Sequence, residues 1–144
     1  MNIYVDTCVI IDFLSKREPF YQDAYELFCE IAKDERLIAY TSVKSVSDIY
    51  YVLHGILHND IETRKMIIKL ISLLYVSDNS SIDLLKTFSS KKSDFEDDLI
   101  SQLSRRMCLD YIVTRNCKDF DDSVVKAITP KKCLEILKLP ELDT

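Results

Sequence analysis

Acidic residues recur along this 144-residue chain at positions where a folded protein could gather them. Asp6 ends the run NIYVDT, Asp48 lies within a helical pattern, the stretch 93–99 (SDFEDDL) holds four carboxylates in five positions, and Asp119 follows the run DYIVT. Carboxylates that share a partly desolvated cleft raise one another's pKa or bind a cation, and their oxygens suit hard divalent metals. Mg²⁺ or Mn²⁺ is therefore the expected cofactor. A carboxylate-held metal of this kind activates water for attack on a phosphodiester.

Helix capping accounts for part of the charge in SDFEDDL. Ser93 followed three residues later by Glu96 predicts a capping box, and the helix dipole favours acids in a first turn by about 0.3–1 kcal/mol per charge. On a helix, Asp94 and Asp97 lie about 60° apart and can share one cavity, whereas Asp98 points further round. The charge that capping leaves unexplained predicts a cation nearby.

The elements that must position these acids alternate along the chain. Five β-rich runs read as strands: 2–7, 36–40, 73–78, 110–114 and 124–129. Helices are predicted over 20–32 with Pro19 in the first turn, from Thr41 or Ser42 to 57, over 61–73, after Ser80 or Ser81, from SDFEDDL onward, and over 130–137. The alternation predicts an α/β fold, a three-layer α/β/α sandwich around a central parallel sheet of about five strands. No repeat or linker interrupts it, so residues 1–144 are expected to form a single domain.

Parallel strands explain how distant acids could meet. In open α/β sheets, ligands collect beyond the carboxyl ends of the strands. Asp6 and Asp119 follow the first and fourth strands, Asp48 lies one turn into the helix after the second, and Asp94 and Asp97 open the helix before the fourth. Acids from four regions are thus expected at one edge of the sheet.

Composition limits the classes of protein that fit. The chain is 47% hydrophobic and 30% charged with one glycine, which is typical of a compact, helix-rich protein. Its net charge of −5 argues against nucleic-acid binding driven by global charge, yet a local basic rim could form from Arg105, Arg106, Arg115 and Lys118.

Location is read from the same composition. No apolar run approaches the roughly 20 residues of a membrane span, and no export signal opens the chain, so a cytoplasmic protein without a membrane partner is expected. Five cysteines without a C-x-x-C pair fit reduced thiols.

Four motifs together resemble a known family. The segments YVDTCVIIDFL (4–14), TSVKSVSDIYYVL (41–53), DFEDDL (94–99) and DYIVTRNCKDF (110–120) are similar, in order and spacing, to those of PIN-domain ribonucleases, especially VapC-like bacterial toxins. The resemblance covers nearly the whole chain. It implies a Mg²⁺- or Mn²⁺-dependent endoribonuclease, usually a homodimer, whose toxic members are held by a small antitoxin protein lying over the active-site groove.

The resemblance also assigns roles by position. Asp6 and Asp97 match acids that bind the metal, and Asp119 matches the late acid that completes the metal site directly or through water. Asp94 is an additional candidate ligand. Asp48 matches a catalytic acid that is usually Glu, so its shorter side chain could weaken metal binding or act through water.

Further positions match supporting side chains around these acids. They are Thr41 or Ser42 as a hydroxyl near the catalytic centre, Thr114 and Asn116 as groups that orient water and the late acid, and Arg115 and Lys118 as candidate RNA contacts. Asn116 is an acid in many relatives.

Two other functions compete with the nuclease. A phosphoacceptor receiver domain is also α/β, and Asp78 after the third strand would be its acceptor, but this reading leaves SDFEDDL and Asp119 unexplained. The other is a catalytically silent PIN-like module that binds RNA or protein, with Asp48 as a sign of decay.

Overall fold

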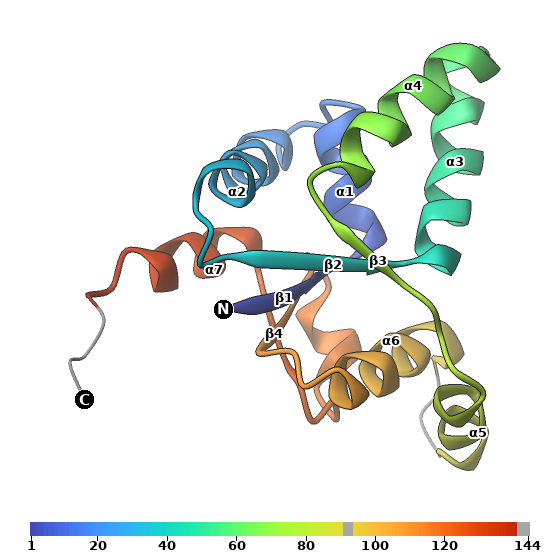
Figure 1. Ribbon diagram of the computed structural model, residues 1–144, viewed down its shortest axis with the longest axis vertical. Coiled ribbons are helices and arrows are strands. Elements are labelled where there is room, and N and C mark those ends of the chain that lie inside the picture. The colour runs from blue at the N-terminus through green and yellow to red at the C-terminus, as the bar shows by residue number, and fades with distance from the viewer. Residues whose placement is uncertain (91–93, 141–144) are drawn as a thin grey trace.

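A parallel sheet forms the centre of the protein (Figure 1). It has five strands in the order β3-β2-β1-β4-β5. The computed structural model describes residues 1–90 and 94–140. The strands are β1 (Asn2–Val5), β2 (Ile38–Ser42), β3 (Tyr75–Ser77), β4 (Tyr111–Val113) and β5 (Lys126–Ile128). The predicted parallel sheet is confirmed, and β1, which is followed directly by Asp6, lies in the middle of it.

Helices cover both faces of the sheet and make the predicted three layers (Figure 1). One face is covered by α1 (Thr7–Leu14), α2 (Tyr21–Lys33), α3 (Val43–Leu57), α4 (Asp60–Ile71) and α7 (Pro130–Leu137). The other face carries α6 (Phe95–Arg106), with α5 (Ser81–Ser89) beside it, and the short 3₁₀ helix η1 (Cys117–Phe120).

The strands contribute side chains to two separate hydrophobic cores, because successive side chains point to opposite faces of the sheet. Ile3 and Val5 of β1 belong to the larger core under α1–α4, whereas Tyr4 belongs to the smaller core with Leu103 of α6. All four side chains are fully buried. Both faces of the central strand are therefore covered, as is usual for parallel sheets.

Helix α1 was not predicted from the sequence. Its sequence TCVIIDFL is apolar almost throughout, and Val9 and Ile10 are fully buried, so it lacks the alternation of polar and apolar faces that identifies a surface helix. Helix α2 begins at Tyr21, so Pro19 precedes it and does not lie in its first turn.

Side-chain caps set where the helices at the sheet edge begin. Ser42 caps α3 by accepting the amide of Ser45, and Ser80 caps α5 in a capping box with Asp83, which settles both alternatives left by the sequence. The predicted cap at Ser93 lies outside the described residues. The N-cap of α6 is Asp94.

The state of the cysteines and the length of the helices bear on the expectations of reduced thiols and of no membrane span. All five cysteines are free thiols. Within residues 1–90 and 94–140, the helices are too short or too polar to cross a bilayer.

Candidate active site

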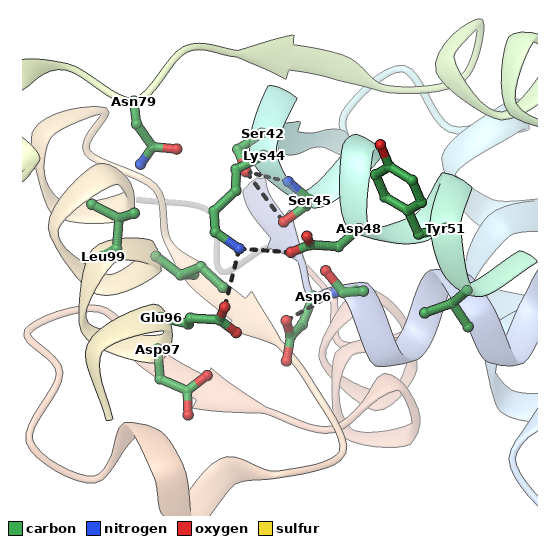
Figure 2. Close-up of a pocket in the computed structure, with 13 residues that line it drawn as sticks. Asp6, Ser42, Lys44, Ser45, Asp48, Tyr51, Asn79, Glu96, Asp97 and Leu99 are labelled. Atoms are coloured by element: carbon green, nitrogen blue, oxygen red, sulfur yellow. Dashed lines mark hydrogen bonds and ion pairs between the residues drawn. The ribbon is translucent and has the colours of Figure 1, made fainter. Parts of the chain in front are cut away.

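A cleft of about 410 Å³ opens between α3 and α6 at the carboxyl edge of the sheet (Figure 2). Its floor includes residues at the ends of β1 and β2, and its walls are formed mainly by the N-terminal halves of the two helices. Four carboxylates line it, from Asp6, Asp48, Glu96 and Asp97. The topology therefore brings acids from three of the four predicted regions into one cleft, because the carboxyl ends of parallel strands share one edge of the sheet.

Asp6 is the most enclosed of these acids, with 8% of its surface exposed. It caps α1, and its Oδ1 accepts the Thr7 amide at 2.8 Å. Its Oδ2 accepts the Thr114 hydroxyl at 2.8 Å and the Cys8 thiol at 3.6 Å. Burial raises the pKa of Asp6, the charge of Asp119 adds to the rise, and these hydrogen bonds oppose it.

Thr114 links the ends of β1 and β4. It is fully buried at the end of β4, and its hydroxyl accepts the Asn116 amide at 3.1 Å while it donates to Asp6. Thr114 therefore orients Asp6, the first acid of the pattern, whereas the resemblance implied a role in orienting water and the late acid. Asn116 contributes through its backbone, and its side chain is exposed.

Asp97 carries the largest electrostatic perturbation in the cleft. Burial raises its pKa to about 7, and the charges of Asp94, Asp6, Asp119 and Glu96 add to the rise. A carboxyl group with this pKa exchanges its proton near neutral pH, and a bound cation would favour its charged form. The concentration of negative charge predicted from the sequence is therefore centred on Asp97.

Asp94 and Asp119 lie beside the main cleft. They line a smaller neighbouring pocket of about 180 Å³ together with Asp98 and Lys118. The Asp94 carboxylate accepts the Asp97 amide at 2.9 Å as the cap of α6. Both acids are near enough to influence the pKa of Asp97, but neither lines the cleft that Asp6 and Asp97 share.

The donor set suits a divalent metal chemically without forming a finished metal site. Within the described part of the chain, no three His, Cys, Asp or Glu side chains are arranged as a ready metal-binding group. Asp6 and Asp97 offer hard oxygen donors, and no described cation forms an ion pair with either. These residues fit Mg²⁺ or Mn²⁺ if neighbouring carboxylates turn toward the ion.

Lys44 is the residue of this cleft that sequence reasoning missed. Its Nζ lies 2.7 Å from Asp48 Oδ2 and 3.2 Å from Glu96 Oε1, and so bridges α3 and α6 (Figure 2). The four-residue spacing places Lys44 and Asp48 on the same face of α3, where an ion pair between them is common. The contact with Glu96 crosses 52 residues of sequence, which no local pattern reports.

A hydroxyl network supports the start of α3. Ser42 lines the cleft, and its Oγ lies 3.0 Å from the Tyr4 hydroxyl, which is 2.7 Å from Ser45 Oγ. Thr41 is fully buried and does not line the cleft. Of the two hydroxyls matched by the resemblance, Ser42 is the one at the site.

The basic residues expected around the acids have other contacts. Arg115 pairs with buried Asp12 at 2.6 Å, and its guanidinium lies 3.9 Å from the ring centroid of Phe20. Arg106 forms a two-pronged pair with Asp83 on α5. The predicted basic rim is therefore depleted at these two positions, because both guanidinium groups bind carboxylates of their own chain.

Lys118 remains exposed in η1 next to Asp119. An RNA contact by Lys118 or Arg115 stays a prediction. Asp78, the acceptor of the receiver reading, follows β3 at the sheet edge and does not line the cleft with Asp6.

Comparison with known proteins agrees with this geometry. The sequence matches the PIN domain over residues 2–118. Among solved structures, VapBC2 from Rickettsia felis bound to promoter DNA is 14% identical with a TM-score of 0.67, covering 90% of this chain and 98% of that one. A toxin–antitoxin complex from Klebsiella pneumoniae is 21% identical with a TM-score of 0.64, covering 89% and 97%.

A third similar structure is VapC20 of Mycobacterium tuberculosis, described as a toxin that cleaves the sarcin–ricin loop. It is 14% identical with a TM-score of 0.61 and covers 76% of this chain and 86% of that one. No curated protein sequence matches the chain. The fold and the cleft together define an α/β/α domain with an acid-lined site at the carboxyl edge of its parallel sheet. Within this class of domains, this chain belongs to the PIN-domain family.

Proposed function

We propose that this protein is a Mg²⁺- or Mn²⁺-dependent endoribonuclease that acts as the toxin of a toxin–antitoxin pair. The observation that carries the proposal is the position of Asp97, a carboxyl group with a pKa of about 7, in the same cleft as Asp6 on a PIN fold. Carboxylates without a cationic partner at the carboxyl edge of the sheet form a suitable site for a divalent cation.

Asp6, Asp97 and Asp119 would hold the ion, with Asp94 as an additional ligand. When bound, a divalent ion supplies activation of water and stabilises charge on the leaving oxygen. Thr114 fixes the orientation of Asp6 through its hydroxyl hydrogen bond. Asp97 would hold the ion as a charged carboxylate, because a bound cation favours the deprotonated form.

Asp48 would act on the opposite wall of the cleft. Its carboxylate is paired with Lys44, so its catalytic contribution is to position that ammonium. Ser42 and Ser45 hold the first turn of α3 against Tyr4, and the same helix carries Lys44 and Asp48.

RNA is the proposed substrate, and the similar toxin VapC20, described as cleaving the sarcin–ricin loop, supports this class of substrate. The similar toxin–antitoxin complexes support an antitoxin protein as partner. We further propose that residues 1–144 act as one domain, that the protein is a homodimer, and that it works in the cytoplasm.

The alternative is a PIN-like module that binds RNA or protein without cutting. Two observations favour it: Asp48 is engaged by Lys44, and the described carboxylates do not form a ready metal-binding group. Metal binding alone does not separate the two functions, because a silent site can still bind metal.

Cleavage separates them. Purified, partner-free protein is incubated with total cellular RNA and Mn²⁺ or Mg²⁺, with EDTA and the variant Asp6→Asn as negative controls. Asp23→Asn on α2, outside the cleft, is the matched control for removing one carboxylate. Discrete fragments from wild type and Asp23→Asn that vanish in both negative controls are expected. Intact RNA in the presence of folded, metal-bound wild-type protein would favour the binding module.

A further inference from the structure

Lys44 is the only cation among the described residues that line the acidic cleft. It projects from the first turn of α3 across the opening toward α6 (Figure 2). Its ammonium contacts one carboxylate on each wall, Asp48 at 2.7 Å and Glu96 at 3.2 Å. A positive charge is therefore already built into one side of this site.

This contact divides the four carboxylates of the cleft into two pairs. Asp48 and Glu96 share the Lys44 ammonium. Asp6 and Asp97 form no ion pair with any described cation. The demand for an added cation thus falls on the Asp6 and Asp97 side of the cleft.

One divalent ion on the Asp6 and Asp97 side, together with the Lys44 ammonium, would give the cleft two cationic groups, as in a two-metal nuclease site. In two-metal sites, a pair of ions about 3.5–4 Å apart clamps the attacking and leaving oxygens of a phosphoryl group. An ammonium has three N–H donors, and Asp48 and Glu96 use two of those of Lys44. The third donor suits an anionic phosphate oxygen.

We propose that Lys44 takes the place of a second metal ion: it keeps Asp48 and Glu96 from binding metal, so that the cleft accepts one divalent ion, and its free N–H binds the phosphodiester. This inference rests on the proposed nuclease function. It explains why a lysine stands one helical turn before the acid of the second motif.

Mn²⁺ titration without RNA tests the proposal, with the number of bound ions measured by calorimetry and by electron paramagnetic resonance. Wild type is expected to bind one Mn²⁺. Lys44→Met frees Asp48 and Glu96 and is expected to bind a second. The double variant Lys44→Met with Asp48→Asn should return to one ion, because the freed carboxylate is removed again.

Lys65→Met is the matched control, since Lys65 is an exposed lysine paired with Glu62 on α4, outside the cleft. It should bind one Mn²⁺ with wild-type affinity. Circular dichroism establishes that each variant is folded.

Two Mn²⁺ ions in wild type would overturn the proposal even if Lys44→Met failed to fold. One ion with unchanged affinity in a folded Lys44→Met variant would overturn it as well. If wild type binds one ion and cleaves RNA while Lys44→Met matches it, only the Lys44 inference fails. If wild type binds no Mn²⁺ and leaves RNA intact, the nuclease function and the inference both fail.

Discussion

The Thr114 hydroxyl donates to Asp6 Oδ2 at 2.8 Å, across 108 residues of sequence. This bond joins the carboxyl ends of the adjacent strands β1 and β4 directly below the cleft. Because Thr114 also accepts the Asn116 amide, its hydroxyl hydrogen is left to point at Asp6. The orientation of the most enclosed acid of the cleft is thus set by a residue that follows the neighbouring strand.

Thr114→Val should weaken metal binding and cleavage. The change keeps the shape of the side chain but removes a hydrogen bond that lowers the pKa of Asp6. Loss of such an outer contact typically costs about 10–100-fold in metal affinity or activity. Mn²⁺ calorimetry at pH 7 and initial cleavage rates measure the effect.

Thr63→Val provides the control for that substitution. Thr63 is equally buried, and its hydroxyl donates to the Asn59 carbonyl on the far helix α4. The Thr63→Val variant should be less stable than wild type but should bind Mn²⁺ with the same affinity. Equal Mn²⁺ affinities for Thr114→Val and wild type would remove Thr114 from the site.

Asp97→Asn should stabilise the metal-free protein, and more so at high pH. The pKa of Asp97 is about 7 when folded and about 3.9 in an unfolded chain, so the folded state binds more protons between these values. The free energy of unfolding of wild type therefore falls as the pH rises from about 4 to 7. Asparagine cannot ionise and avoids this loss.

Thermal unfolding in EDTA at pH 5 and pH 8 checks this prediction. The melting temperature of Asp97→Asn minus that of wild type should be larger at pH 8. With Mn²⁺ present, wild type should have the higher melting temperature, because it gains stability from an ion that the variant binds poorly. A difference that does not change with pH would contradict the raised pKa.

Breaking the Asp12–Arg115 pair should destabilise the fold. Asp12 is 1% exposed and Arg115 23% exposed, so the pair is largely buried. Removing one partner of a fully buried pair costs roughly 3–5 kcal/mol, and about 2–3 kcal/mol is expected here because Arg115 is partly solvated. Urea unfolding of Asp12→Asn and Arg115→Met should give similar losses.

Binding of a non-cleavable RNA tests the alternative role of Arg115. If the guanidinium is structural, Arg115→Met and Asp12→Asn should have equal RNA affinities when folded. A selective loss in Arg115→Met would instead establish Arg115 as an RNA contact.

Tyr4→Phe should cost about 1 kcal/mol of stability, the usual net value of a buried hydrogen bond. The Tyr4 hydroxyl lies between Ser42 and Ser45 beneath the first turn of α3, and the two serines remain bonded to each other at 3.1 Å without it. Cleavage should fall less than in Thr114→Val. Tyr75→Phe, at an exposed position on β3, should leave unfolding in urea unchanged.

The sequence by itself determined the parallel α/β fold and the order of its acids. Strand ends, caps and helical stripes are local features, so Asp6, Asp48 and Asp97 could each be placed at the end of a strand or the start of a helix. Helix α1 was not predicted, because a helix that is buried on nearly all sides lacks the polar face by which helical periodicity is recognised in a sequence.

Tertiary structure decided which side chains meet. Lys44 reaches Glu96, Asp12 pairs with Arg115, and Asp119 lies beside the cleft that holds Asp97. These contacts depend on β1 lying between β2 and β4 and on α3 facing α6 across the sheet edge. Local periodicity carries no information about such through-space neighbours, because it records the face on which a residue lies and not the element packed against that face.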